Sequence, residues 1–457
     1  MVAKAADAPS LRLLAAPVRN SRGGTIAIAR QTPAVRTEGE TTVQSLRVNG
    51  ERLWNTVMET ARFGGTPGGG ITRLTLSDED RDVRDWFVAR CKAIGCTVTV
   101  DEVGNIFARR SGFDNARRPI AFGSHLDTQP SGGKFDGVAG VLVGLEMLRT
   151  LDENHVTTTA PLELINWTNE EGSRFAPTMI ASGAFAGIYS TEYAHGLKDR
   201  QGKTFRGELE RIGYLGDRPA GDHTLAACFE LHIEQGPILD QEGITIGVVT
   251  GAQGQRWYDV GVQGRASHAG STPMHVRRDA MLACARITDG VNRIALSHAP
   301  SGMATVGLVE VRPNSRNVIP GDVFFTVDLR HPDGDVLMGM DREFEALASG
   351  VAHATRTKIS IECVLDLRPT RFDERCVSMV REAAERLGYS HRDIVSGPGH
   401  DTVNVARVAP AAMVFVPCVE GISHNEVEAA RQEDLTAGAN VLLHAVLEYD
   451  RGSANAV

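Results

Sequence analysis

Five short stretches of this sequence carry histidines and carboxylates beside glycine or at the ends of apolar segments. They are Gly123-Ser-His125-Leu-Asp127, Lys134-Phe-Asp136-Gly137, Asn169-Glu170-Glu171-Gly172, Leu231-His232-Ile-Glu234-Gln235 and Ser423-His424-Asn425-Glu426. Together they supply imidazoles and carboxylates without thiolates, a ligand set that suits zinc, manganese or cobalt. A single histidine or aspartate in a loop is more often a capping or surface residue than a metal ligand. The hypothesis of a metal site therefore depends on the whole set.

Three acids in this set have the arrangement that a two-metal centre needs. A metal pair requires a carboxylate that bridges ions about 3.5 to 4 Å apart, and we predict that Asp136, held by the following glycine, is this bridge. Adjacent desolvated carboxylates such as Glu170 and Glu171 repel each other unless a cation or a proton intervenes. We therefore expect one of this pair to bind metal and the other to carry a proton.

Alternating strand and helix patterns place these residues at one edge of a sheet. The expected elements are strands at 97–100, 105–109, 120–123 and 162–167, and helices near 53–63, 82–94 and 138–148. Such alternation indicates an α/β layered domain. Two of the strands would deliver His125 and the Glu170-Glu171 pair to the carboxyl edge of a parallel sheet, where open α/β sheets bind ligands.

The pattern changes between Gln255 and Asp366. The expected strands are at 257–262, 305–311, 323–329 and 358–364, and the expected helices are at 277–296 and 342–351. Their order, βαββαβ, is that of a ferredoxin-like split unit, which is best interpreted as an inserted second domain. We therefore predict a metal-binding domain formed by 45–251 and 368–457, with an inserted domain at 252–367.

Size and charge fit two globular domains and argue against polyanion binding. The chain has 457 residues, of which 42% are hydrophobic, enough for two cores. A formal net charge of -9 disfavours nucleic acid, because such contacts depend on clustered lysine and arginine. No apolar run approaches the roughly 20 residues of a membrane helix. Seven scattered cysteines without a CxxC pair suit a reducing compartment, so we expect mostly buried thiols and a cytoplasmic protein.

Two further segments allow more than one interpretation. Residues 1–44 are rich in basic side chains and lack strong periodicity, so we expect a disordered extension, with a transit peptide as the alternative. The glycine-rich stretch from Phe63 to Ile71 lacks the Gly-Lys-Ser/Thr ending of a phosphate-binding loop. We predict a flexible surface loop there, and no nucleotide chemistry.

The five motifs resemble those of the hydantoinase/carbamoylase family of amidases, within the superfamily of two-metal aminoacylases and carboxypeptidases. The likeness runs from about Val48 to about Leu447, and its most discriminating feature is His232, because related peptidases usually have an acidic ligand there. The resemblance implies a metallopeptidase-like catalytic α/β domain with an inserted ferredoxin-like domain that serves in dimerisation or as a lid. It also implies two divalent ions per subunit, zinc first, with manganese, cobalt or nickel as alternatives.

The resemblance assigns a role to each motif. One metal would be held by His125 and His232, the other by Glu171 and His424, and Asp136 would bridge them. The general base would be Glu170, and Asp127 would orient the histidine ligand two residues earlier. The positions that resemble substrate-binding residues are Gln235, His268, Asn317, Arg330, Gly399 and His400.

Members of this family are dimers in which the smaller domain mediates pairing. We therefore expect a homodimer, in which His268, Asn317 and Arg330 act either within their own subunit or across the interface. His268 would also help to stabilise the negative charge that develops on the carbonyl oxygen. Without the metal motifs, a surface ion pair at Arg330, a turn residue at Asn317 and a capped loop histidine at His268 would be the preferred interpretations.

The expected activity is hydrolysis of the ureido C–N bond of a small N-carbamoyl amino acid that carries a carboxylate. Glu170 would take a proton from the attacking water and return it to the departing nitrogen, giving the amino acid, ammonia and carbon dioxide. Cleavage of 3-ureidopropionate, a beta-ureidopropionase activity, would follow the same steps. The nearest alternative is an allantoate amidohydrolase, since allantoate also joins a ureido group to a carboxylate. A catalytically silent, metal-binding dimeric homologue is the alternative from another class.

Overall fold

The computed structural model describes residues 43–454. The extension predicted for residues 1–44, and with it the transit-peptide alternative, lies outside the described residues except at its end. There Val43–Ser45 form a 3-10 helix that leads into the first long helix.

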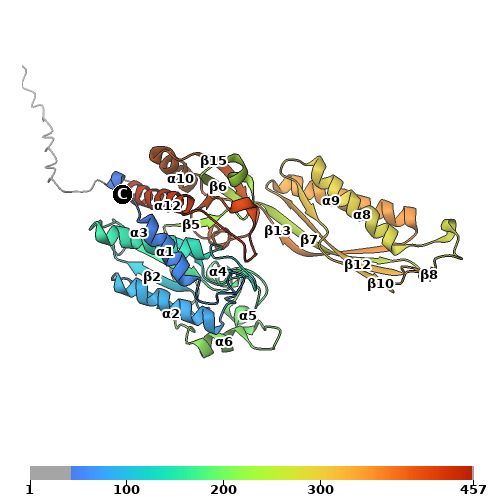
Figure 1. Ribbon diagram of the computed structural model, residues 1–457, viewed down its shortest axis with the longest axis horizontal. Coiled ribbons are helices and arrows are strands. Elements are labelled where there is room, and N and C mark those ends of the chain that lie inside the picture. The colour runs from blue at the N-terminus through green and yellow to red at the C-terminus, as the bar shows by residue number, and fades with distance from the viewer. Residues whose placement is uncertain (1–42, 455–457) are drawn as a thin grey trace, which may run out of the picture. The chain divides into compact units, whose positions relative to one another are not determined.

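A nine-stranded mixed sheet forms the larger part of the fold (Figure 1). Its strands are β1 (Thr97–Val100), β2 (Ile106–Arg110), β3 (Ile120–His125), β4 (Leu162–Trp167), β5 (Ala227–Ile233), β6 (Ile246–Ala252), β14 (Thr370–Arg371), β15 (His391–Ser396) and β16 (Ala411–Val416). The order is β1-β2-β4-β3-β5-β16-β6-β14, with β15 beside β6. Strands β4, β3, β5 and β16 are parallel neighbours, which confirms the parallel edge expected from the sequence.

Helices cover this sheet. The long ones are α1 (Gly50–Thr60), α2 (Asp78–Ala93), α3 (Val138–Glu153), α10 (Glu374–Leu387) and α12 (Gln432–Ala454); the short ones are α4 (Ile180–Phe185), α5 (Thr191–Gly196), α6 (Phe205–Ile212), α7 (Ile238–Glu242) and α11 (Asp401–Val405). Helix α3 is buried around most of its circumference. It approaches the sheet closely at Gly144, where an added Cβ would lie 3.0 Å from a ring carbon of Phe122. This helix begins at Val138, two positions after Asp136, so its packing against the sheet helps to position that residue.

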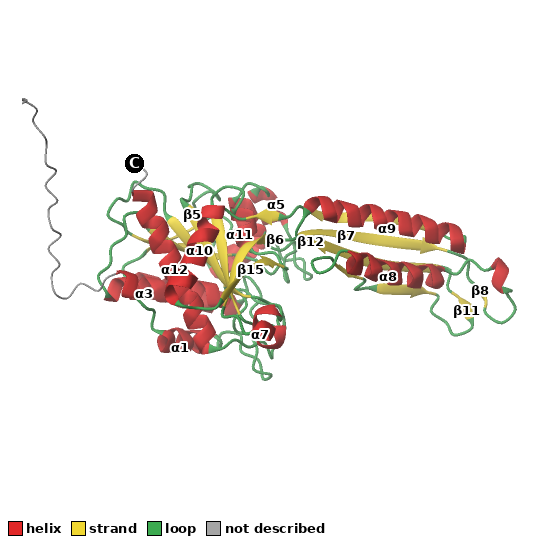
Figure 2. Ribbon diagram, turned by 90° about the horizontal axis from the view of Figure 1, so that it is seen from above, coloured by secondary structure: helices red, strands yellow, loops and turns green. Residues whose placement is uncertain are grey.

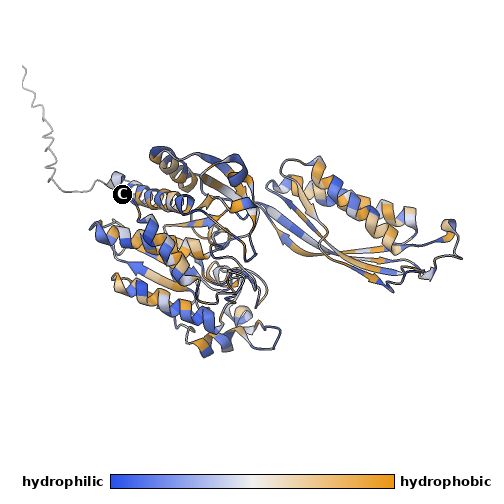
Figure 3. Ribbon diagram, viewed as in Figure 1, coloured by the Kyte–Doolittle hydropathy of each residue, from blue (hydrophilic) through white to orange (hydrophobic). Residues whose placement is uncertain are grey.

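A second, five-stranded antiparallel sheet has its own core. Its strands are β7 (Gly254–Gln263), β9 (Met303–Thr305), β10 (Val309–Arg312), β12 (Asp322–His331) and β13 (Lys358–Leu367), and its helices are α8 (Ala280–Ser297) and α9 (Gly334–Thr355). The order is β10-β12-β7-β13, with β9 beside β12. Both helices lie side by side along this sheet (Figure 2), and hydrophobic and hydrophilic residues alternate along them, as amphipathic helices require (Figure 3).

The order of elements in this second unit is the expected βαββαβ, with two corrections. The single strand expected at 305–311 is interrupted, because Thr305 pairs with Asp328 and Val309 with Phe325, so that one strand has an extra residue at a bulge. Helix α9 begins at Gly334 and not near 342, because Asp333 caps it by accepting backbone N–H groups. The exact domain boundaries at 252 and 367 stay a prediction.

A buried ion pair within α2 orients an arginine that connects this helix to the sheet. The Nε of Arg84 lies 2.8 Å from Oδ2 of Asp80, and both side chains are fully buried. Arg84 also donates hydrogen bonds to the carbonyl of Gly104 and the hydroxyl of Thr168, next to the end of β4. The pair therefore fixes the backbone that leads to Glu170.

Breaking this pair should destabilise the protein strongly. The substitution Asp80→Ala leaves Arg84 buried without its counter-ion, so we expect the free energy of unfolding to fall by about 3–5 kcal/mol in urea titrations. The matched substitution Asp82→Ala removes a half-exposed carboxylate that pairs with Arg81, and should change it by less than about 0.5 kcal/mol. A similar small effect of both substitutions would contradict this interpretation.

The cysteines agree with the expectation of mostly buried thiols. All seven are free, six are buried, and Cys363 is exposed. Among the described residues, no helix is both long and apolar enough to cross a membrane.

Candidate metal centre

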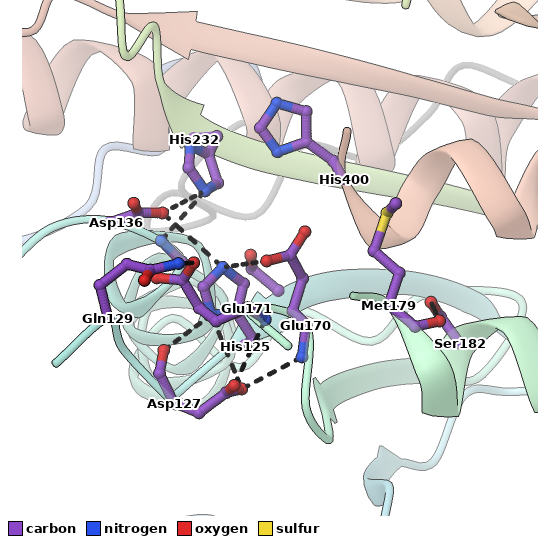
Figure 4. A network of polar contacts seen from close by, with 12 residues as sticks. His125, Asp127, Gln129, Asp136, Glu170, Glu171, Met179, Ser182, His232 and His400 are labelled. Atoms are coloured by element: carbon purple, nitrogen blue, oxygen red, sulfur yellow. Dashed lines mark hydrogen bonds and ion pairs between the residues drawn. The ribbon is translucent and has the colours of Figure 1, made fainter. Parts of the chain in front are cut away.

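The five predicted metal ligands come together at the carboxyl ends of neighbouring parallel strands. His125 is the last residue of β3, Asp136 precedes α3, and Glu171 follows β4. His232 lies near the end of β5, and His424 lies in the loop after β16. The four strands are consecutive in the sheet, so ligands from distant parts of the chain converge on one point. Figure 4 shows four of the five, His125, Asp136, Glu171 and His232.

Asp136 lies between the two groups of ligands. Its Oδ1 is 3.2 Å from Nε2 of His232 and 3.7 Å from Nε2 of His125. Its Oδ2 is 3.1 Å from Nε2 of His424, which in turn is 3.6 Å from Oε2 of Glu171. Each carboxylate oxygen therefore faces a different set of donors, as a bridging ligand must.

The donor set fits two divalent cations. The ligand atoms of His125, Asp136 and His232 all lie within 4.8 Å of one another, and so do those of Asp136, Glu171 and His424. Nitrogen and oxygen donors without sulfur suit zinc, manganese, cobalt or nickel. The arrangement supports binding of divalent metal and leaves the choice among these ions open.

Burial and neighbouring charges shift the pKa values of these side chains. Burial lowers the pKa of His125 to about 4, so this imidazole is neutral at pH 7 and can act as a ligand. Burial opposes the charged form of His232, but the hydrogen bond and charge of Asp136, together with the charge of Glu230, raise its pKa to about 9. Burial and the nearby Asp136 raise the pKa of Glu171 well above its usual range. A cation would take the place of the protons that these groups otherwise hold.

Glu170 is placed differently from Glu171. Its Oε2 lies 3.6 Å from Nε2 of His125, at the side of the cluster (Figure 4). Burial first, and then the nearby carboxylates of Asp401 and Glu171, raise its pKa well above the usual range. A carboxyl group with a raised pKa beside a metal site can both accept and donate a proton near neutrality.

Asp127 contacts His125 through its backbone carbonyl and the two glutamates through its carboxylate. Its backbone carbonyl lies 2.9 Å from Nδ1 of His125, whereas its carboxylate is 3.8 Å away. The carboxylate oxygens accept the backbone N–H groups of Glu170 and Glu171, each at 3.4 Å. Asp127 therefore holds the Glu170-Glu171 turn, and it is the backbone that orients the histidine.

Two of the predicted substrate-binding residues line a cleft of about 570 Å³ that also includes His424. Gln235 lines it and donates a hydrogen bond of 2.8 Å to Oδ2 of Asp136. Arg330 also lines it, paired with Asp328 at 2.8 Å and donating to the carbonyl of Gly397.

Gly399 and His400 do not line this cleft; Gly399 is exposed and His400 is buried. An added Cβ at Gly399 would meet the side chain of Met179. His400 is buried, with its ring centroid 4.5 Å from that of His232. It contacts the cluster through the ring of a predicted ligand.

The structure does not bring His268 and Asn317 to this centre. His268 lies on β8 (Ser267–His268), which pairs only with β11 (Val318–Ile319) among the described strands. Its Nδ1 accepts hydrogen bonds from the backbone N–H groups of Gly270 and Ser271. Within one chain, its side chain has the contacts of a capped loop histidine.

Two residues that support the cluster were missed by sequence reasoning. Glu428 is buried and accepts the backbone N–H groups of Phe135 and Asp136 as well as the Ser423 hydroxyl. It thereby connects the loop of the bridging aspartate to the loop of His424. Gln129 donates a hydrogen bond of 2.6 Å to Oε2 of Glu171. Their nearness to the motifs was the only signal, since neither has a distinctive pattern of its own.

Comparison with known proteins agrees with this geometry. The profile of peptidase family M20/M25/M40 matches residues 121–448, and the chain belongs to that family. A protein of Rhizobium meliloti called N-carbamoyl-L-amino-acid amidohydrolase is 49% identical over 89% of this chain and 97% of its own. An allantoate amidohydrolase of Bacillus subtilis is 34% identical over 84% of this chain and 93% of its own.

Solved structures show which branch of this family the chain resembles. The crystal structure of an amidase of the hydantoinase/carbamoylase family from Burkholderia multivorans is 57% identical, with a TM-score of 0.87, over 89% of this chain and 98% of that one. Within the larger family this chain is therefore a hydantoinase/carbamoylase-type amidase, as its motifs suggested. It is a hydrolase of carbon–nitrogen bonds other than peptide bonds.

Proposed function

We propose that this protein hydrolyses N-carbamoyl-L-amino acids to the free L-amino acid, ammonia and carbon dioxide, using two divalent metal ions. The observation that carries the proposal is the position of Asp136 between the two ligand groups, with Glu170 beside them. Relatives that are 36 to 49% identical bear the name of this activity. Free cysteines suit a reducing compartment, and we expect the enzyme to act in the cytoplasm.

The bound metal ions and Glu170 have separate roles in the proposed reaction. Bound metal ions would acidify a water molecule and polarise the ureido carbonyl. Glu170 accepts the proton of the attacking water and then donates it to the departing nitrogen. Zinc is our first choice of metal for the His125–His232 pair, since imidazole and carboxylate ligands suit it well.

Arg330 is proposed to bind the substrate carboxylate. A guanidinium offers two parallel donors to a carboxylate, a geometry that lysine cannot copy. Arg330 already makes this kind of contact with Asp328, at the edge of the cleft that contains His424. A substrate carboxylate would compete with Asp328 for the same donors. Gln235, Gly399 and His400 complete the proposed substrate-binding residues.

The test is ammonia release by zinc-reconstituted enzyme from four compounds: N-carbamoyl-L-methionine, its D isomer, 3-ureidopropionate and allantoate. We expect the L-carbamoyl compound to be the best substrate and Glu170→Gln to slow its turnover by at least about 100-fold. Activity on allantoate alone would replace the proposal with the allantoate amidohydrolase that lower-identity relatives represent. Metal-bound protein that is inactive on all four would favour a silent homologue.

We further propose that the enzyme is a homodimer in which His268 and Asn317 complete the partner's site. Within one chain these residues lie on β8 and beside β11, without contact to the metal ligands. A symmetric dimer could bring the same pair of residues to both sites at once.

Mixing two inactive variants tests this arrangement. A dimer of one Glu170→Gln subunit and one His268→Ala subunit would contain one intact site if His268 acts across the interface. Random mixing should then restore about a quarter of wild-type activity, as symmetric pairing predicts. Each variant alone, refolded in the same way, is the control. Mixtures no more active than the separate variants would show that His268 does not act in the partner's site.

A further inference from the structure

The glycine-rich segment Gly64–Gly70 is a closed loop whose base pairs with the stretch that leads to Asp136. Thr72 donates its backbone N–H to Gly64, and Ile71, which is fully buried, exchanges backbone hydrogen bonds of 2.9 and 3.0 Å with Gly132. Pro67 to Gly69 are exposed as expected for a surface loop, but Gly70 is buried. The expectation of a flexible loop is therefore wrong for the ends of this segment.

This segment also contacts the loop that carries His424. The hydroxyl of Thr66 hydrogen-bonds the carboxylate of Glu426, and the same hydroxyl accepts the backbone N–H of Gly70 at 3.1 Å. An added Cβ would lie 2.7 Å from the carboxyl carbon of Glu426 at Gly68, and 2.7 Å from its Cα at Gly70. At Gly70 the added Cβ would also meet the backbone oxygen of Gly132, so only glycine fits there without displacing backbone, whereas at Gly68 only the end of the Glu426 side chain would have to move.

His424 needs such support more than the other ligands do. Its side chain is 51% exposed, whereas those of His125, Asp136, Glu171 and His232 are 6% exposed or less. Its backbone also has a φ of +54°, a conformation that a non-glycine residue keeps only when its surroundings impose it. Little packing of its own side chain fixes its position, so the adjacent backbone must.

We propose that Gly64–Gly70 is a positioning element for His424, acting through Glu426 and so setting the affinity of the metal ion that His424 and Glu171 hold. The inference depends on the proposed role of His424 as a ligand. Arg73 extends the same support, because it and Thr128 exchange hydrogen bonds of 2.9 Å beside the loop of Gln129. The segment and the residues that follow it thus contact the loop of His424 and the loop of Gln129, whose side chain hydrogen-bonds Glu171.

The proposal predicts a selective loss of one metal ion. In calorimetric titration of metal-stripped protein with Zn²⁺, we expect Thr66→Val and Gly70→Ala each to weaken one binding step by about 10- to 100-fold, the effect typical of residues that orient a ligand. The other step should stay within about twofold of wild type. Glu426→Gln, which keeps an acceptor for Thr66, should retain most of the affinity. Gly196→Ala, where an added Cβ meets nothing within 4 Å, is the matched control.

The variant His424→Ala separates this inference from the proposed function. If the segment acts through His424, adding Thr66→Val to His424→Ala should cause no further loss of zinc affinity. Equal weakening of both steps, unchanged affinity in Thr66→Val, or an additive loss in the double variant would overturn the proposal. If Gly70→Ala does not fold, Thr66→Val alone decides. Wild-type protein that binds fewer than two ions would instead refute the metal centre itself.

Discussion

The substitution Glu170→Gln should slow ammonia release by about 10²- to 10⁴-fold while the protein keeps both metal ions, since proton transfer by a positioned side chain contributes that much. An amide has the size of the carboxyl group but cannot accept and return a proton. The measurement is kcat on N-carbamoyl-L-methionine together with metal content by elemental analysis. A fall in kcat with an unchanged metal content would place Glu170 in proton transfer.

Two results would contradict this role. Loss of metal from Glu170→Gln would make Glu170 a ligand, although it belongs to neither of the two ligand groups around Asp136. A kcat within tenfold of wild type would assign the proton transfer to another group. A suitable comparison is Glu192→Gln, which changes a carboxylate exposed on α5 and should leave kcat and metal content unchanged.

The second large effect is expected at Asp136. Replacement by asparagine removes the charge that both ligand groups share, so both metal ions should bind at least about 100-fold more weakly, more than the loss of an outer-shell partner causes. By contrast, His424→Ala should weaken only one of the two. Zinc titration of metal-stripped protein distinguishes these patterns. Asp152→Asn, on the exposed face of α3, provides the control.

A selective loss at Asp136 would be informative too. If Asp136→Asn weakened only one ion, this aspartate would be a terminal ligand, although its two oxygens face different histidines. Turnover should fall in parallel with the occupancy of both sites. Full activity at partial occupancy would mean that one ion suffices for catalysis.

The convergence of the ligands could be predicted because strand periodicity determines where strands end. His125 and Glu171 each follow a short apolar strand, and parallel neighbours end at the same edge of the sheet. Helix α3 could also be predicted, because its almost continuous apolar sequence requires burial on all sides. Local pattern was sufficient in these places because the pattern and the tertiary environment agree.

The remaining features depend on contacts between distant segments. Glu428 looks like an ordinary acid in a polar stretch, and only the fold brings it to the backbone of Asp136. The same is true of Gly70, whose lack of a side chain matters because Glu426 lies against it. A bulge such as that between Thr305 and Val309 adds one residue without changing the composition, so no periodicity reveals it.

The path of the chain between the two sheets has a consequence for how such enzymes diversify. The chain leaves the nine-stranded sheet after Ala252 and returns at Thr370, and these two residues pair directly. Every proposed metal ligand lies outside the 117 intervening positions, whereas Arg330 lies within them. Because its two ends adjoin, the intervening unit can change in length or sequence without moving the metal ligands. The contact that Arg330 offers can therefore vary independently of them, whereas Gln235, Gly399 and His400 belong to the same part of the chain as the ligands.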